Sequence, residues 1–171
     1  AEVSDVAAAI YEGTDAVMLS AESAAGAYPI EAVQTMNAVA IEVESDPTYR
    51  DVTAASRGGR RETTADGIVV AAREIAETTE IKAICCFSQS GTTARLIARE
   101  RPSKPIIAMT HLQGTARKMV LTWGLHWVIV PKLERFKQAV VNSARAARAD
   151  EFADAEDQIL VIAGVPFNVP G

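Results

Sequence analysis

Aromatic residues, cysteines and long apolar runs are all scarce in this chain of 171 residues. Aromatic residues make up only 5% of the sequence while hydrophobic residues make up 49%, so the core must consist mainly of Ala, Val, Ile and Leu. No apolar run approaches the roughly 18 residues that a transmembrane helix requires. We therefore expect no membrane association, and a length that suits one domain or one domain with part of another.

The cysteines, histidines and charge balance exclude further classes of protein. Cys85 and Cys86 are adjacent in an apolar run, which predicts buried thiols in a reducing cytoplasm rather than a disulfide or a zinc site. The net charge of −5 argues against binding to nucleic acid or to an anionic membrane. His111 and His126 have no evident partner for metal or base chemistry, so we predict no metal site in this chain.

Residues 1–47 predict a helix, a strand and a second helix. Val3–Tyr11 has a helical pattern, and the apolar run Asp15–Leu19 predicts a short buried strand. The second helix is predicted to start at Pro29, because proline is favoured in the first turn of a helix. Such a unit cannot cover both faces of its own strand. Residues 48–64 are polar and predict a linker.

Residues 65–171 alternate between short apolar runs and helical patterns. The predicted strands are residues 82–87, 105–110, 125–130 and 158–163, and the predicted helices follow Thr64 or span 92–101, 114–121 and 133–149. The helix after Thr64 is expected to bury a face made of Ile68, Ala71, Ala72, Ile75 and Ala76. Helical crossovers between successive strands imply a largely parallel sheet. The predicted fold is a three-layer αβα domain.

One loop of this domain has the composition of an anion-binding site. After the strand that ends at Phe87, the sequence SQSGTT leads into a predicted helix; its residues are Ser88, Gln89, Ser90, Gly91, Thr92 and Thr93. Gly91 permits close approach of the backbone, and the first N–H groups of the helix are free donors beside a positive helix dipole. Ligands of open α/β sheets bind beyond the carboxyl ends of strands. We therefore predict phosphate binding by uncharged donors.

A simpler explanation of the same loop is a helix cap. Ser90 or Thr92 would then accept a hydrogen bond from the first turn of the helix, with no ligand involved. The four hydroxyl groups in six residues exceed what one cap requires. No nucleophile and base accompany the loop, so its phosphate is expected to be a signal rather than a substrate.

The segment AEVSDVAAAIYEGTDAVMLSAESAAGAYPIEAV resembles the end of the catalytic barrel of pyruvate kinases. ICCFSQSGTTARLIARERPSKPIIAMT, LTWGLHWVIV and the closing GVPFNVPG resemble the C-terminal domain of the same family, so the resemblance covers essentially the whole chain. It implies the end of a (β/α)8 barrel in residues 1–47 and an effector-binding α/β domain in residues 65–171. The chain begins without a strand and ends directly after one, so we expect a fragment whose final strand lies beyond Gly171.

The resemblance also implies an activity and a set of partners. The parent enzyme would transfer the phosphoryl group of phosphoenolpyruvate to ADP, giving pyruvate and ATP, with Mg²⁺ and K⁺, as a cytoplasmic homotetramer in glycolysis. The metal ligands and the catalytic lysine of the family lie on earlier barrel strands. Ser20 and Glu22 match the motif at the rim of the active site, whereas Ala21 and Ser23 stand where many members have Gly and Thr. We expect the chain alone to be inactive.

In the family, the loop that matches Ser88–Thr93 grips the phosphate of an allosteric effector. The loop from Gly164 through Val165 and Pro166 to Gly171 is implied to close over the same ligand. Members regulated by fructose bisphosphate carry a longer insertion with a Trp and an Arg for the second phosphate, which the segment VPKLERFKQAV lacks. Lys137 is a candidate substitute for that arginine. We therefore expect a sugar monophosphate or AMP as the effector.

Two alternative functions remain at this stage. The SxSGxT loop also resembles the phosphosugar-binding domain of sugar isomerases, although the segment DAVMLSAESAAGAYP has no counterpart in that family. A second alternative is a domain that serves only in contacts between subunits, without binding phosphate. Replacement of Gly91 by a bulky residue separates these hypotheses, because only a phosphate-binding loop would lose effector binding.

Overall fold

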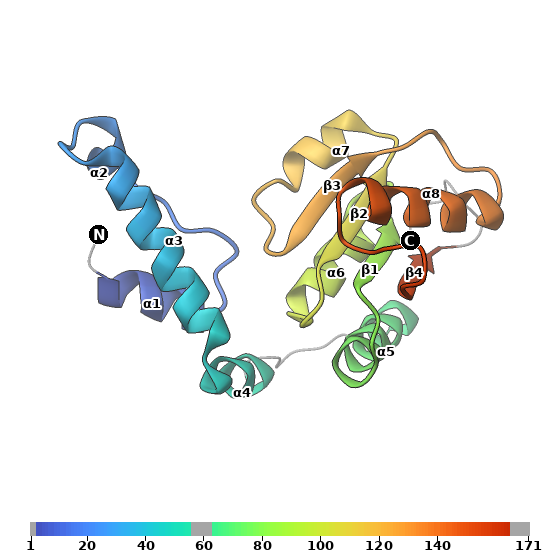
Figure 1. The fold of residues 1–171 in the computed structure, drawn as a ribbon, viewed down its shortest axis with the longest axis horizontal. Coiled ribbons are helices and arrows are strands. Elements are labelled where there is room, and N and C mark those ends of the chain that lie inside the picture. The colour runs from blue at the N-terminus through green and yellow to red at the C-terminus, as the bar shows by residue number, and fades with distance from the viewer. Residues whose placement is uncertain (1–2, 56–62, 165–171) are drawn as a thin grey trace. The chain divides into compact units, whose positions relative to one another are not determined.

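A computed structural model of the chain describes residues 3–55 and 63–164 (Figure 1). The chain divides into two compact units, Ala1–Arg60 and Arg61–Gly171, and each unit has its own hydrophobic core. Within the described ranges, no helix combines the length and the apolar character that a membrane span demands.

The first unit is helical throughout its regular structure. Its helices are α1 (Val3–Tyr11), α2 (Ala21–Ala24), α3 (Pro29–Ser45) and α4 (Pro47–Ala55). A small core forms where Val6 and Ile10 of α1 meet Val43 of α3 and Tyr49 of α4. The hydroxyl of Tyr11 donates a hydrogen bond of 2.6 Å to Asp46, between α3 and α4. The predicted start of α3 at Pro29 is confirmed.

Two predictions for this part of the chain are wrong. Residues 15–19 form no strand, and the described residues of the unit contain no strand at all with which they could pair. A strand is stable only beside a neighbour that takes up its backbone hydrogen bonds. Residues 47–55, most of which were assigned to a linker, form helix α4 and bury Tyr49 and Thr53.

The second unit is built on a four-stranded sheet in which all strand pairs are parallel. The strands are β1 (Ala83–Phe87), β2 (Ile106–Thr110), β3 (Leu125–Ile129) and β4 (Ile159–Ala163), in the spatial order β3-β2-β1-β4. The helices are α5 (Thr64–Thr78), α6 (Thr92–Arg99), α7 (Gln113–Lys118) and α8 (Phe136–Ala149). The predicted αβα class is confirmed, and each predicted strand lies within one residue of its observed bounds.

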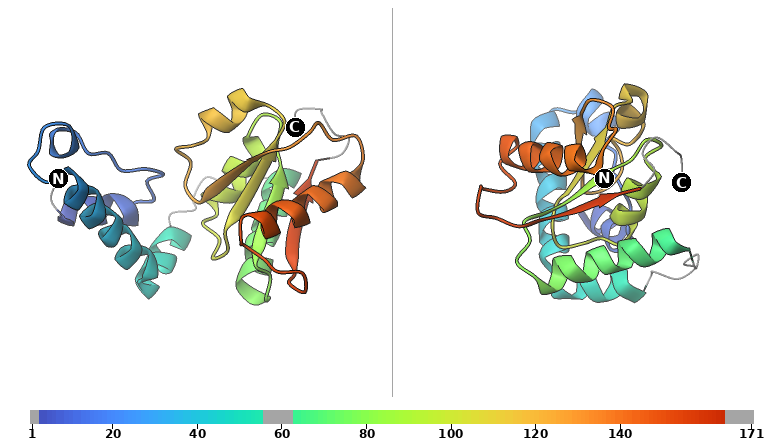
Figure 2. Two further views of the ribbon diagram at one scale, coloured as in Figure 1. Left: turned by 45° about the horizontal axis from the view of Figure 1, so that its top comes forward. Right: turned by 90° about the vertical axis from the view of Figure 1, so that its right-hand side faces the viewer.

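Helices cover both faces of this sheet (Figure 2). Ile84, Cys86 and their neighbours on β2 pack against α5 and α6, whereas Ala83 and Cys85 pack against α8. This alternation is the two-residue period of a strand, and it makes every position of the two central strands apolar except Thr110, the last residue of β2. The core consists mainly of small and branched aliphatic residues, as the scarcity of aromatic residues predicted.

Helix α5 buries only part of the predicted face: Ala72 and Ala76 are buried as expected, but Ile68, Ala71 and Ile75 are exposed. Asp66, Val69, Ala72 and Ala76 are its buried residues, while Ile68 and Ile75 are 48% and 37% exposed. A periodicity of three and four residues fits two adjacent faces of this helix, and the face with the smaller side chains is the one that packs closely. The helix is capped by Thr63 and not by Thr64, because the Thr63 hydroxyl accepts from the N–H of Asp66.

Helices α7 and α8 are shorter than predicted. Helix α8 begins at Phe136 because Gln138 Oε1 accepts hydrogen bonds from the N–H groups of Glu134 and Arg135, at 2.9 and 3.0 Å. This side chain satisfies donors that would otherwise lie free ahead of the first turn. Helix α7 ends at Lys118 rather than at residue 121.

Candidate functional site

The predicted phosphate loop lies between β1 and α6, at the carboxyl end of the sheet. The N–H of Ser88 donates to the carbonyl of Met109 at 3.0 Å, so the loop starts as a continuation of the β1–β2 ladder. Ser88 is buried, and Ser90 and Thr92 are exposed. The loop therefore has a fixed base and a hydroxyl-bearing outer edge.

Gly91 is the residue that precedes α6, and its backbone is left-handed, with φ 86° and ψ −3°. No side chain caps this helix by a hydrogen bond to its second or third residue. The hydroxyls of Ser90 and Thr92 lie 2.9 Å apart, and the N–H of Thr92 reaches Ser90 Oγ only at 3.4 Å. The cap hypothesis is wrong in its cap residue, which is Gly91, but Ser90 does accept the long contact from the first turn that this hypothesis described.

The amide of Gln89 is a further unusual feature of this loop. Its Oε1 atom is buried and has no hydrogen-bond partner within the described part of the chain. A buried acceptor without a partner costs roughly 1–3 kcal/mol. Rotation of the amide by 180° would put its NH₂ group at the same place, and that group is a donor.

The other residues predicted around the effector fall in two places. Gly164 directly follows β4, and because Ala163 pairs with Phe87, Gly164 lies at the same sheet edge as the loop. Val165 and Pro166 lie outside the described residues. Lys137 lies in the first turn of α8 and lines a pocket of about 460 Å³.

This pocket is mainly basic. Its charged side chains are Lys132, Arg135, Lys137 and a single carboxylate, Glu134. It opens at the start of α8, which follows β3, so it too belongs to the carboxyl end of a strand. These cationic side chains could pair with a second acidic group of an extended ligand, whereas the Ser88–Thr93 loop contains no cationic side chain.

Ser20 and Glu22, the predicted rim residues, lie at the start of α2 in the first unit. The N–H of Ser20 donates to Glu22 Oε2 at 3.0 Å, and the hydroxyl of Ser23 reaches the carbonyl of Ser20 at 3.4 Å. In residues 3–55 and 63–164 no group of three or more His, Cys, Asp or Glu side chains has the arrangement of a metal site.

His126 has a partner that the sequence did not reveal, in a surface contact rather than in a site for metal or base chemistry. Its Nε2 lies 2.9 Å from Asp150 Oδ2, and its ring packs edge-on against Phe152. Twenty-four positions separate His126 from Asp150 in the sequence, so spacing gave no sign of the pair. Both side chains are well exposed, which is typical of a surface contact between a strand and a helix end.

The two thiols are buried as predicted. Burial raises the pKa of Cys85 to about 11 and that of Cys86 to about 12. A thiol with such a pKa is protonated at neutral pH and is neither a nucleophile nor a metal ligand.

The second unit is an α/β domain whose parallel sheet is covered on both faces. A hydroxyl-rich loop at the end of its central strand β1 leads into α6, and this loop is a candidate phosphate site. The family described as "Pyruvate kinase, alpha/beta domain" matches residues 66–171, and "Pyruvate kinase, barrel domain" matches residues 1–33. The chain belongs to the pyruvate kinase family.

Individual relatives agree with this assignment. The pyruvate kinase of Methylorubrum extorquens is 42% identical over the whole chain, and that of Clostridium acetobutylicum is 40% identical. A crystal structure of a pyruvate kinase from Cryptosporidium parvum covers 98% of this chain with a TM-score of 0.86 and 30% identity. Another structure of that organism's enzyme, in complex with ADP, has a TM-score of 0.81.

The chain spans only about a third of these relatives: 36% of the two bacterial proteins and 34% of the Cryptosporidium chains. The predicted resemblance is confirmed over both units. The alternative resemblance to sugar isomerases does not describe this chain, because the pyruvate kinase match includes the SQSGTT loop itself.

Proposed function

We propose that the Ser88–Thr93 loop binds the phosphate of a regulatory monophosphate, either a sugar monophosphate or AMP. The observation that carries this proposal is the start of α6. Gly91 opens the helix with a left-handed backbone, and the N–H of Thr92 makes only a long 3.4 Å contact with Ser90 Oγ, which an anion can replace. The family assignment supports it, since the match of the α/β domain includes this loop.

The loop would hold a phosphate dianion by uncharged donors alone. The N–H groups of the first turn and the positive end of the helix dipole attract the anion. The hydroxyls of Ser90 and Thr92, which contact each other in the free loop, would turn toward the phosphate oxygens. Gln89 would present its NH₂ group after rotation of its amide. Because no cation is fixed in the loop, the ligand can also leave it readily.

The basic pocket around Lys137 would receive the rest of a longer ligand. Lys132, Arg135 and Lys137 are exposed at the start of α8, where they suit a weakly held second acidic group better than a second tightly bound phosphate. We therefore favour monophosphate over bisphosphate effectors. Gly164, directly after β4, would lie beside the ligand.

Isothermal titration of the 171-residue chain tests this proposal. Glucose 6-phosphate or AMP should bind, and fructose 1,6-bisphosphate should bind no more tightly than they do.

Replacement of Ser90 by Ala together with Thr92 by Val should weaken binding at least tenfold, since each lost hydrogen bond to a charged group is worth roughly 1.5–3 kcal/mol. Thr78→Val is the control, because its hydroxyl donates to the carbonyl of Glu74 on the exposed side of α5. Much tighter binding of the bisphosphate would contradict the choice of ligand.

We further propose that the parent protein transfers the phosphoryl group of phosphoenolpyruvate to ADP, giving pyruvate and ATP, as a homotetramer. Its Mg²⁺ and K⁺ ligands and catalytic lysine would lie in barrel segments other than residues 1–33, which are the part of the barrel family matched here. The described carboxylates of this chain form no metal-binding group, so its contribution would be limited to the rim residues Ser20 and Glu22. Pyruvate formation by the 171-residue chain alone, measured with phosphoenolpyruvate and ADP, would contradict this division of roles.

A further inference from the structure

Helix α7 supports the back of the Ser88–Thr93 loop. The hydroxyl of Thr115, on α7, donates a hydrogen bond of 2.8 Å to the carbonyl of Gln89, 26 residues earlier in the chain. Thr115 is itself held in place, because its own N–H bonds to the carbonyl of Leu112 at 3.0 Å at the start of α7. The contact therefore links a carbonyl of the loop after β1 to helix α7, which follows the neighbouring strand β2.

This tie fixes the orientation of one peptide group of the loop. The C=O of Gln89 and the N–H of Ser90 belong to the same planar trans peptide, so they point in opposite directions. Because the carbonyl is directed toward α7, the N–H of Ser90 points to the side of the loop away from α7. Without the tie, the peptide could rotate and present its carbonyl oxygen, which repels an anion.

A second contact constrains the loop from Met119, the residue directly after α7. Met119 is 1% exposed, and its sulfur fills the space where a Cβ atom on residue 91 would lie. The Gly91 backbone thus rests directly on the Met119 side chain. This contact supports the left-handed backbone of Gly91 on the side that faces Met119. It leaves the start of α6 uncovered on the opposite side.

Met119 also connects the loop to β3. The indole Nε1 of Trp127 donates to the carbonyl of Met119 at 3.3 Å, and the Trp127 ring packs on the same core as Met119. Trp127 and Trp123 are the two tryptophans of the chain. A movement of Met119 should therefore change the environment of an intrinsic fluorophore.

We propose that Thr115 and Met119 are positioning residues for the phosphate loop. They hold Gln89 and Gly91 in the shape that turns the loop's N–H groups outward, without contacting the ligand. This inference rests on the proposed function of the loop. It differs from that function because it locates part of the affinity in α7 and in the residue directly after it, which carry none of the phosphate-binding groups.

Two substitutions of Thr115 test the inference in the 171-residue chain. Thr115→Val removes the donor at nearly constant volume, and Thr115→Ser keeps it. Titration with glucose 6-phosphate and with AMP should show affinity about tenfold lower for the valine variant, the ratio expected for one lost hydrogen bond. The serine variant should bind like the unaltered chain. The amide NMR signal of Ser90 should shift in the valine variant and not in the serine variant.

Met119→Leu provides a second measurement that keeps the core filled. Its branched carbon presses on Gly91, so we expect weaker binding of both phosphates and a changed tryptophan emission. If the unaltered chain binds glucose 6-phosphate or AMP and both the Thr115→Val and Met119→Leu variants bind it equally well, the positioning role is wrong while the phosphate site stands. If the unaltered chain binds neither probe, the proposed function fails and this inference fails with it.

Discussion

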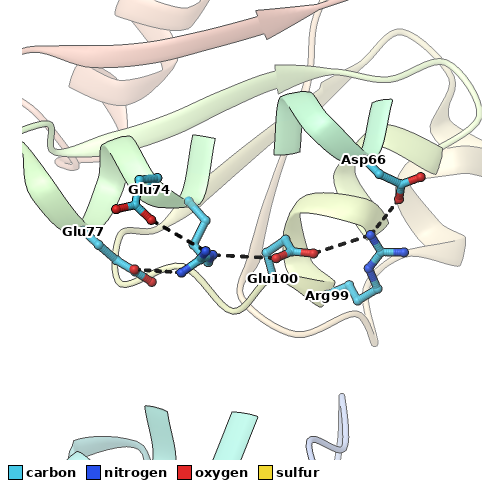
Figure 3. A network of polar contacts seen from close by, with 6 residues as sticks. Asp66, Glu74, Glu77, Arg99 and Glu100 are labelled. Carbon is cyan, nitrogen blue, oxygen red and sulfur yellow. Dashed lines mark hydrogen bonds and ion pairs between the residues drawn. The ribbon is translucent and has the colours of Figure 1, made fainter. Parts of the chain in front are cut away.

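Arg99, in the last turn of α6, donates a hydrogen bond of 2.8 Å to Asp66 in the first turn of α5. Figure 3 shows that this contact belongs to a network that continues through Glu100 to an arginine of α5 and to Glu77. That arginine is Arg73, whose Nε lies 3.7 Å from Glu100. The phosphate loop begins the same helix that this network anchors at its other end, so the direction of α6 is fixed independently of any ligand.

The first prediction concerns the pH dependence of stability. The hydroxyl of Thr63 and the guanidinium of Arg99 hold the pKa of Asp66 below its ordinary value. A carboxylate with a lowered pKa contributes stability that is complete above its unfolded-state pKa, about 4, and is lost as the pH falls through the folded-state value. We expect Asp66→Asn to lower the free energy of unfolding at pH 7 and to reduce its fall below about pH 4, measured by urea unfolding between pH 7 and pH 2.5.

Glu74→Gln is the matched control for that experiment. Glu74 lies on the same helix but is 62% exposed, and its nearest cation is Arg73 at 3.7 Å. Exposed pairs of this kind contribute little. Equal acid sensitivity of the Asp66→Asn chain and the unaltered chain would show that Asp66 does not carry the effect.

The second prediction concerns the buried member of the network. Glu100 is 1% exposed and contacts both Arg99 and Arg73. Removal of one partner of a buried ion pair leaves the other charges poorly compensated and costs roughly 3–5 kcal/mol. We therefore expect Glu100→Ala to lower the free energy of unfolding by about 3 kcal/mol.

Glu77→Ala is the control, because it removes only an exposed contact to Arg73. It should lower the free energy of unfolding by less than about 0.5 kcal/mol. Similar losses in urea unfolding would contradict the buried role of Glu100.

Local signals in the sequence were sufficient to predict the layers of the second unit. Each strand is a mainly apolar run, directly preceded by Lys82, Pro105, Gly124 or Gln158, and these signals act over a few positions. Which of two faces a helix buries is not decided by such local signals but by packing against the rest of the domain. Ile68 and Ile75 were predicted to be buried on α5, and the structure buries Val69 instead, because the fit against α6 and the sheet decides the face.

The position of the loop between a strand and a helix could be predicted, but the contacts that shape it could not. Hydroxyls around Gly91 after a strand predict an anion site from short-range sequence alone. The contacts that shape the loop come from Thr115 and Met119, which are distant in the sequence and ordinary in composition. The strand predicted at residues 15–19 failed for the same reason, since a strand depends on a partner and not only on its own apolar residues.

The third prediction is that the cysteines are chemically inert in the folded chain. Burial raises the pKa of Cys85 to about 11 and that of Cys86 to about 12, so the thiolate fraction at pH 8 is negligible. Iodoacetamide at pH 8 should modify neither thiol in native buffer and both in 8 M urea, as measured by intact mass. Rapid modification of native protein, faster than global unfolding, would show that the central strand is exposed by local opening.

The fourth prediction is that Ser143→Ala stabilises the second unit. Ser143 Oγ is completely buried on α8 without a hydrogen-bond partner in the described residues, and the nearby Cys85 thiol is only a weak hydrogen-bonding group. Removal of the hydroxyl also places a better helix former at this position. We expect a gain of about 1 kcal/mol in urea unfolding. Ser103→Ala should instead be destabilising, because its hydroxyl donates to the carbonyl of Ala76.

The fifth prediction separates two costs at Gly91. Alanine there meets a left-handed backbone, which costs roughly 1–2 kcal/mol, and collides with the Met119 side chain, which adds about 1–3 kcal/mol of overpacking. Gly124 is the matched control in the same unit, because its φ is 67° but a Cβ there would meet only Ile106, at 4.0 Å. Gly124→Ala should cost about 1 kcal/mol and leave the binding of glucose 6-phosphate unchanged.

Gly91→Ala should cost clearly more than Gly124→Ala in urea unfolding and should also abolish binding of glucose 6-phosphate in titration calorimetry. The added methyl group can be accommodated only if the loop lifts off Met119, which turns the first N–H groups of α6 away from their common direction. Two results would contradict this reasoning in different ways. Equal stability losses would mean that Met119 yields easily, and unchanged phosphate affinity would mean that the start of α6 is not where the anion binds.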